Sequence, residues 1–392
     1  MPSYLAPGVY VEEVPSAVKP IAGVGTSTAG FVGIVEGGVT MPLVPGTTDS
    51  YTVAAALDPV PINNWSEFEM NFGEISDGNQ YLAHAVYGYF NNGGTRCWVI
   101  RVTSATVTDA LELFEAIDEI TIVAAPMPPD TALNTIHSDL VTHCQLMEDR
   151  VAILDSAEEV TDLVITTDDT GIWRPSANPK GYGAFYFPWI QVADPLLSPG
   201  TLIAVPPSGH MAGIYARSDA QRGVHKAPAN EVILGALGVK YPVSKILQAT
   251  LNPLGVNVIR SFNGTIKVWG ARTLASDPQG DPEWVYISVR RLFNFMRESI
   301  DQGTQWAVFE PNSSDLWASI RRNIKAFLWN VWDSGALFGD TPEEAYYVRC
   351  DETTNPPAVR DLGQVVTEIG VAVVKPAEFV VFRISQWAGP GE

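Results

Sequence analysis

Residues 81–102 read YLAHAVYGYFNNGGTRCWVIRV, and this stretch decides the fold class. Its first ten residues, 81–90, are typical of a helix, and Asn91-Asn92-Gly93-Gly94 is a strong helix-ending signal. Residues 97–102 then predict a strand. A helix followed directly by a strand is the repeating unit of an α/β sheet with helical crossovers.

The same alternation extends to both sides of this stretch. We expect strands at residues 31–35, 121–125, 151–155, 183–190, 201–205 and 266–270. We expect helices at residues 110–119, 131–149, from about Met211 onward and at 315–332, and an amphipathic helix or a strand followed by a helix at 286–300. Residues 41–64, rich in Pro, Thr and Asp, are expected to form a surface excursion. The first half is therefore predicted to be α/β, and the second half is less regular.

Charge is distributed unevenly along the 392 residues, whose net charge is −20. Residues 1–200 hold 6 Lys and Arg against 25 Asp and Glu, whereas residues 201–392 hold 18 against 19. An acidic half repels nucleic acid and anionic membranes, so we expect neither as a partner. The first half is either a soluble acidic surface or an exposed outer layer, and in the second case the near-neutral half makes the contacts.

The amino-acid composition limits the broad class of protein further. The apolar share of 46% and the charged share of 17% are those of a globular protein. No run of about 18 apolar residues occurs, so no membrane span is predicted. The start, Met1-Pro2-Ser3-Tyr4, lacks the basic and apolar stretch of a secretory signal, so we expect none. Cys97, Cys144 and Cys350 are odd in number and widely spaced, as expected for reduced, buried thiols in a protein made in the cytosol.

Both ends of the chain are predicted to be extended and strand-like. Near the start, Val9 and Val11 alternate with Tyr10 and Glu12. Near the end, residues 375–384 are a β-rich run that contains Phe379, Val380, Val381 and Phe382. An apolar strand needs a partner, because an unpaired edge aggregates. The ends therefore either pair within their own domain or add to sheets of neighbouring subunits, and the second arrangement would make the protein a polymer.

Catalytic and metal-binding motifs are absent from the sequence. There is no HExxH, no paired CxxC and no GxSxG, and residues 22–30 resemble a phosphate-binding loop only loosely. Ser208 and His210 could be combined with Asp155 or Asp219 as a hydrolase triad, but Pro206-Pro207-Ser208-Gly209 is better interpreted as a turn whose Ser caps the next helix. His84, His137 and His143 are expected to be core or surface histidines. We therefore predict no catalytic residue, metal or cofactor.

The expected helix at residues 315–332 carries two contrasting faces. Its apolar face is formed by Trp317, Ile320, Ile324, Phe327, Leu328 and Val331. Arg321, Arg322 and Lys325 gather on the other side, and no Asp or Glu lies between Ala318 and Val331. This basic cluster is either an ordinary solvated face or a docking surface for an acidic partner.

Several segments, in order along the whole chain, resemble the sheath proteins of contractile phage tails, R-type bacteriocins and extracellular contractile injection systems. They are residues 7–13, 90–94, 187–189, 205–213, 222–230, 269–274, 289–292, 309–312 and 375–379. The strongest single stretch is Arg222-Gly223-Val224-His225-Lys226-Ala227-Pro228-Ala229-Asn230.

The resemblance implies a fold class of α/β plus α+β. It implies a non-catalytic, subtilisin-like α/β domain at residues 21–265, with an acidic outer part at about 30–200, and a C-terminal α+β domain at 266–372. Residues 1–20 and 373–392 would be extended β arms.

The resemblance also implies a structural role without cofactors. Such proteins assemble as stacked hexameric rings in a helix around an inner tail tube, joined by exchange of arms. The helix that carries Arg321, Arg322 and Lys325 resembles the element that sheaths turn towards the tube. Further implied partners are baseplate and tail terminator proteins, and the implied location is the bacterial cytoplasm, then an assembled particle. Contraction from a metastable extended state would drive the tube through a target envelope. The alternatives are an α/β hydrolase-like enzyme using Ser208 and His210, and a non-contractile self-assembling shell.

Overall fold

The computed structural model describes residues 20–36, 38–103, 107–129, 131–160, 162–166, 171–196, 199–276 and 282–383. It contains two compact units. The first, called here the α/β unit, comprises Val24–Arg297 together with Val374–Glu392. The second, called the small unit, comprises Glu298–Val373 with the residues up to Gly23. The predicted N-terminal strand residues Val9, Tyr10 and Val11 lie outside the described residues.

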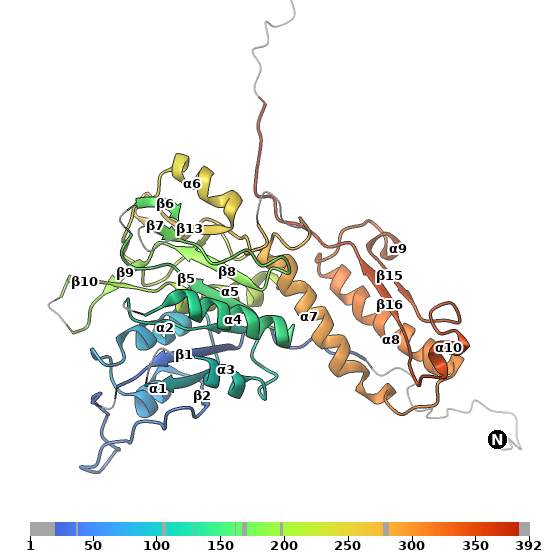
Figure 1. Ribbon diagram of the computed structural model, residues 1–392, viewed down its shortest axis with the longest axis horizontal. Coiled ribbons are helices and arrows are strands. Elements are labelled where there is room, and N and C mark those ends of the chain that lie inside the picture. Colours follow the sequence, from blue (N-terminus) through green and yellow to red (C-terminus); the bar gives the residue numbers. More distant parts are fainter. Residues whose placement is uncertain are drawn as a thin grey trace, which may run out of the picture. The chain divides into compact units, whose positions relative to one another are not determined.

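A mixed sheet is the centre of the α/β unit (Figure 1). Over the described residues it has nine strands in the order β11-β14-β13-β8-β5-β4-β1-β3-β2. The six parallel strands are β1 (Ala29–Ile34), β3 (Cys97–Val102), β4 (Ile122–Ala124), β5 (Val151–Asp155), β8 (Gly183–Phe187) and β13 (Val256–Phe262). The antiparallel edge strands are β2 (Val60–Ile62) at one side, and β14 (Thr265–Val268) and β11 (Glu231–Val232) at the other. Because helices cover both faces, the parallel strands are almost continuously apolar.

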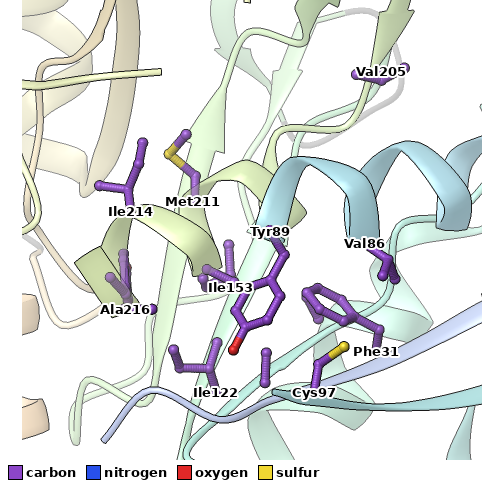
Figure 2. Close-up of a cluster of buried hydrophobic side chains, with 14 of the residues drawn as sticks. Phe31, Val86, Tyr89, Cys97, Ile122, Ile153, Val205, Met211, Ile214 and Ala216 are labelled. Atoms are coloured by element: carbon purple, nitrogen blue, oxygen red, sulfur yellow. The ribbon is translucent and has the colours of Figure 1, made fainter. Parts of the chain in front are cut away.

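Two hydrophobic cores lie on opposite faces of this sheet. One core includes α1 (Trp65–Phe72), α2 (Gln80–Asn91) and α5 (Ser208–Arg222), and the other includes α3 (Thr108–Phe114), α4 (Leu133–Met147) and α6 (Lys245–Leu251). Figure 2 shows the first core, in which side chains of α2 and α5 meet those of the sheet: Val86, Tyr89, Met211, Ile214, Phe31, Ile122 and Ile153. The alternation of helix and strand in the sequence therefore produces a three-layer α/β arrangement.

Smaller elements complete the α/β unit. An antiparallel sheet has the order β10-β9-β12, and β6 pairs with β7 in parallel. Their bounds are β6 (Asp162–Thr166), β7 (Gly171–Trp173), β9 (Ile190–Ala193), β10 (Leu202–Val205) and β12 (Gly238–Val239), and a short 3-10 helix spans Asn252–Leu254. Helix α7 (Ile287–Thr304) begins in this unit and ends in the small unit.

The small unit is built around α8 (Ser314–Asp333). Ser313 caps this helix, because its side chain accepts a hydrogen bond from the amide of Leu316. Two antiparallel strands, β15 (Tyr346–Arg349) and β16 (Glu368–Val371), accompany it. The remaining helices of this unit are short: a 3-10 helix at Gln305–Ala307, α9 (Pro342–Ala345) and α10 (Pro357–Arg360).

Four predictions about single elements were wrong or incomplete. The expected helix at 110–119 ends at Phe114. The expected strand at 183–190 is two strands in different sheets, because Pro188 has no amide hydrogen to continue the ladder. Helix α5 begins at Ser208, three residues before Met211. The excursion at 41–64 also contains the edge strand β2.

The fold class is mixed α/β, as predicted, with one large sheet and helices on both faces. The subtilisin-like detail and the domain boundaries at 265 and 372 stay predictions. None of the helices in the described ranges is both long and apolar enough to cross a membrane.

Candidate assembly site

The C-terminal segment leaves an apolar run without cover. Phe379, Val380, Val381 and Phe382 are 72%, 69%, 76% and 83% exposed. They belong to no helix or strand, and Figure 1 draws this part of the chain as an extended ribbon. None of the four makes a backbone hydrogen bond to another described residue. Four consecutive large apolar side chains are costly to leave in water, which marks the run as an interaction surface.

The root of this segment is fixed by Glu378. Its Oε1 accepts hydrogen bonds from Asn252 Nδ2 at 2.6 Å and Arg272 Nε at 2.9 Å. Its Oε2 accepts from Arg272 Nη2 at 2.7 Å and from Tyr286 OH at 3.1 Å. Burial alone would raise the pKa of Glu378, but the bonds from Arg272 and Asn252 outweigh it and lower this pKa. The carboxylate is therefore held charged and well oriented.

The basic residues of α8 do not form one uniform cluster. Arg321 is half-buried, and its Nη1 donates to the carbonyl oxygen of Cys350 at 2.6 Å. Arg322 and Lys325 are exposed, and Arg322 donates to Ser319 Oγ at 3.2 Å. The partners of Arg321 and Arg322 are a backbone carbonyl and a serine hydroxyl, neither of which is acidic. Of the three basic residues, Arg322 and Lys325 are therefore the two with exposed side chains.

The residues considered as a hydrolase triad do not make triad contacts. Among the described residues, neither the side-chain oxygen of Ser208 nor Nδ1 of His210 has a partner within hydrogen-bonding geometry. His210 is buried next to Gly88 of α2, and burial lowers its pKa to about 3. A nucleophile and its base must be hydrogen-bonded, so this arrangement gives no support to acyl transfer.

The interpretation of Ser208 as a helix cap was also wrong. The N-cap position of α5 is Pro207, which has no capping side-chain bond. Instead the amide of Ser208 donates to Asp155 Oδ1 at 2.8 Å. The carboxyl group at the end of β5 therefore provides a hydrogen-bond acceptor for a backbone amide in the first turn of α5. Burial raises the pKa of Asp155 to about 7.

Three further histidines and the three cysteines are core residues. His84, His137 and His143 are buried, and burial lowers the pKa of each one. All three cysteines are buried free thiols. Across the part of the chain that the structure covers, no group of three or more His, Cys, Asp or Glu side chains is placed to hold a metal ion.

Comparisons with known proteins define the class as phage tail sheath proteins. The family model for the phage tail sheath protein central domain matches residues 101–274, and that for the phage tail sheath C-terminal domain matches residues 279–386. The sheath of an extracellular contractile injection system (PVC), solved in the contracted state, is 30% identical to this chain with a TM-score of 0.75. The match covers 99% of this chain and 99% of that chain. The contracted helical sheath of the anti-feeding prophage is also 30% identical, with a TM-score of 0.76, over 98% of this chain and 100% of that chain.

This chain therefore belongs to the phage tail sheath protein family. The tail sheath protein of Vibrio phage KVP40 is 29% identical over 183 residues, which are 46% of this chain and 26% of that protein. A putative prophage major tail sheath protein of Pseudomonas aeruginosa is 26% identical over 250 residues, which are 60% of this chain and 58% of that protein. These relatives are sheath proteins rather than enzymes, and this chain spans about a quarter to just over half of their lengths.

Two sets of interactions between distant parts of the chain were not predicted from the sequence. One is the set of hydrogen bonds that Glu378 accepts from Asn252, Arg272 and Tyr286. The other is the buried ion pair of Asp219 and Arg291, both of which also bind Thr26. Glu378 lies within residues 375–379, which carried part of the family resemblance, and this was the only available signal. Neither set has a local pattern, because the partners are far apart in sequence.

Proposed function

We propose that this chain is the subunit of a contractile sheath that assembles as stacked hexameric rings around an inner tube. Its likeness to two contracted sheaths over nearly the whole chain supports this proposal. A head-to-tail contact that does not close generates a helical stack by symmetry alone. Contraction would release an extended state that is trapped kinetically, so no nucleotide is required.

The observation that carries the proposal is the uncovered run Phe379, Val380, Val381 and Phe382. An extended apolar segment gains main-chain hydrogen bonds and burial when it adds to the edge of another sheet. The antiparallel pair β15 and β16 suits this role, because an isolated two-stranded sheet is marginally stable. In this proposal Val9, Tyr10 and Val11 form the corresponding N-terminal arm.

Arm exchange explains how a lattice can move without separating. Main-chain hydrogen bonds between exchanged strands survive a rotation of the rigid units, provided that the linkers bend. Gly23 and Gly25 precede β1, and a Cβ on Gly25 would meet no atom within 4 Å. That glycine thus lies in open space, where a linker can change direction.

Arg322 and Lys325 of α8 are the proposed contacts to the inner tube, with a smaller contribution from Arg321. Exposed ion pairs contribute only about 0–1 kcal/mol each, so such a contact can break during contraction. Further proposed partners are baseplate and tail terminator proteins. The subtilisin-like, non-catalytic fold of the α/β domain, synthesis in the bacterial cytoplasm and incorporation into a phage tail or extracellular particle belong to the same proposal.

Electron microscopy of the assembled particle tests the proposal. We expect striated tubes with two states that differ in diameter and pitch before and after triggering. A single invariant tube would favour the non-contractile shell instead. A uniform population of monomers, together with an esterase or protease activity lost in Ser208→Ala, would favour the hydrolase alternative.

A further inference from the structure

Within the described residues, the side-chain hydrogen bonds and the ion pair between the C-terminal arm and the α/β unit are made by Glu378. After Val373 leaves the small unit, Glu378 binds Asn252, Arg272 and Tyr286. No hydrogen bond or ion pair from residues 379–383 to other described residues exists. Glu378 is therefore the last polar anchor before the exposed run in the described part of the chain.

Arg272 is also held by hydrogen bonds within the α/β unit that do not involve the arm. The amide of Arg272 donates to Asn257 Oδ1 at 2.7 Å, and its Nη1 donates to Ser276 Oγ at 3.0 Å. Asn257 is completely buried. The guanidinium therefore keeps its position whether or not the arm is bound, and only the carboxylate belongs to the arm.

The chemistry of these interactions of Glu378 favours a single geometry. Arg272 faces the two oxygens of Glu378 with Nε and Nη2, a paired contact that fixes the direction of the carboxylate as well as its distance. Asn252 and Tyr286 use the remaining acceptor positions. The side chains of Arg272 and Glu378 are 15% and 19% exposed, so salt and water weaken the pair less than they weaken a surface ion pair.

We propose that Glu378 is the positioning residue of the C-terminal arm. It fixes the point and direction in which residues 379–382 leave their own subunit, so that every subunit offers its arm from the same place. This inference rests on the proposed arm exchange and identifies what controls it. Loss of the hydrogen bonds to Glu378 would free the residues from Val374 onward. This would lower the effective concentration of the arm at the sheet of the neighbouring subunit.

Glu378→Gln tests this role because it keeps the shape of the side chain and removes its charge. Glu231→Gln is the matched control, since Glu231 forms a comparably buried ion pair with Lys226 in the same unit. We expect Glu378→Gln to raise the protein concentration needed for assembly about tenfold, as loss of a charged hydrogen-bonding group predicts. We expect the melting temperature of the unassembled subunit to match that of the control, because the arm supports no core.

A charge swap provides the second readout. Arg272→Glu should impair assembly as Glu378→Gln does, and the double variant Arg272→Glu with Glu378→Arg should restore assembly to within about threefold of the wild type. Unchanged assembly of Glu378→Gln would overturn the proposal. A melting temperature that falls together with assembly, without rescue by the swap, would also overturn it, because Glu378 would then act only by stabilising the fold. Failure of the wild-type protein to assemble under the same conditions would contradict the proposed function instead.

Discussion

Asp219 on α5 and Arg291 on α7 form a buried ion pair, in which Arg291 Nη2 lies 2.6 Å from Asp219 Oδ2. Both residues also bind Thr26, through its hydroxyl and its carbonyl oxygen. The pair therefore attaches the segment before β1 to two helices of the α/β unit. The N-terminal linker and the C-terminal arm are thus each fixed at the root by an arginine and a carboxylate.

Asp219→Asn should strongly destabilise the subunit. It leaves the buried Arg291 guanidinium without a counter-charge, and breaking a buried pair on one side costs about 3–5 kcal/mol. Urea unfolding of the unassembled subunit measures this loss. Glu119→Gln, which removes a partly exposed pair with Arg96, is the control and should cost at most about 1 kcal/mol. Equal losses in the two variants would contradict the assigned role of Asp219.

Gly209→Ala should disrupt the packing of α5 on α2. A Cβ at Gly209 would lie 2.2 Å from the carbonyl oxygen of Ala85, a distance that forces the two helices apart. Overpacking of this kind costs about 1–3 kcal/mol, which thermal unfolding detects. Gly25→Ala, which meets no atom within 4 Å, should change stability little. A Gly209→Ala subunit as stable as Gly25→Ala would show that the helices do not pack this closely.

Asp155 should make the stability of the subunit depend on pH. Its pKa is raised from 3.8 to about 7 by burial, so the folded state binds the proton more tightly than the unfolded state. The stability contributed by this group is complete below about pH 4 and is lost as pH rises through about 7, at up to about 1.4 kcal/mol per pH unit.

Asp155→Asn isolates this effect, because buried His137 and His210, with pKa values lowered to about 3, act in the opposite direction in both proteins. The stability of Asp155→Asn relative to the wild type should rise between pH 4 and 7. Chemical unfolding at several pH values gives the difference, and a difference that does not change with pH would refute the raised pKa.

Reversing charge on α8 should weaken binding to the tube. Arg322→Glu with Lys325→Glu is expected to reduce co-sedimentation with the cognate inner tube about tenfold, since each exposed pair contributes up to about 1 kcal/mol. Sheath–sheath assembly should stay largely intact. Lys245→Glu, at an exposed position of α6, is the control for a general change of charge. If the control and the double variant bind the tube alike, the basic residues of α8 form an ordinary solvated face.

The central architecture could be predicted because its signals are local. Residues 81–102 contain a helix, its end and a buried strand, and the structure places α2 and β3 there. The apolar face of α8 likewise predicts its packing, since Ile320, Ile324 and Phe327 are all buried. Periodicity decides such elements because each must bury one side.

The remaining features depend on contacts between distant residues. Asp155 caps α5 from 53 residues away, and Arg272 reaches Glu378 across 106 residues, so no window of sequence contains both partners. The partner of Arg321 is the backbone carbonyl of Cys350. A contact to a backbone group cannot be predicted from a pattern of side chains. For the same reason residues 379–382 could be predicted as an extended apolar run, but the lack of a pairing strand among the described residues could not be predicted.

Removal of residues 379–392 tests arm exchange most directly. Leu146→Ser, which changes an apolar side chain that is 67% exposed on α4, is the control for loss of exposed apolar surface. We expect the truncated subunit to unfold at the same temperature as the wild type and to form no tubes or stacked rings in negative-stain images, whereas Leu146→Ser assembles. Normal tubes from the truncated subunit would contradict the proposal that this arm joins neighbouring subunits.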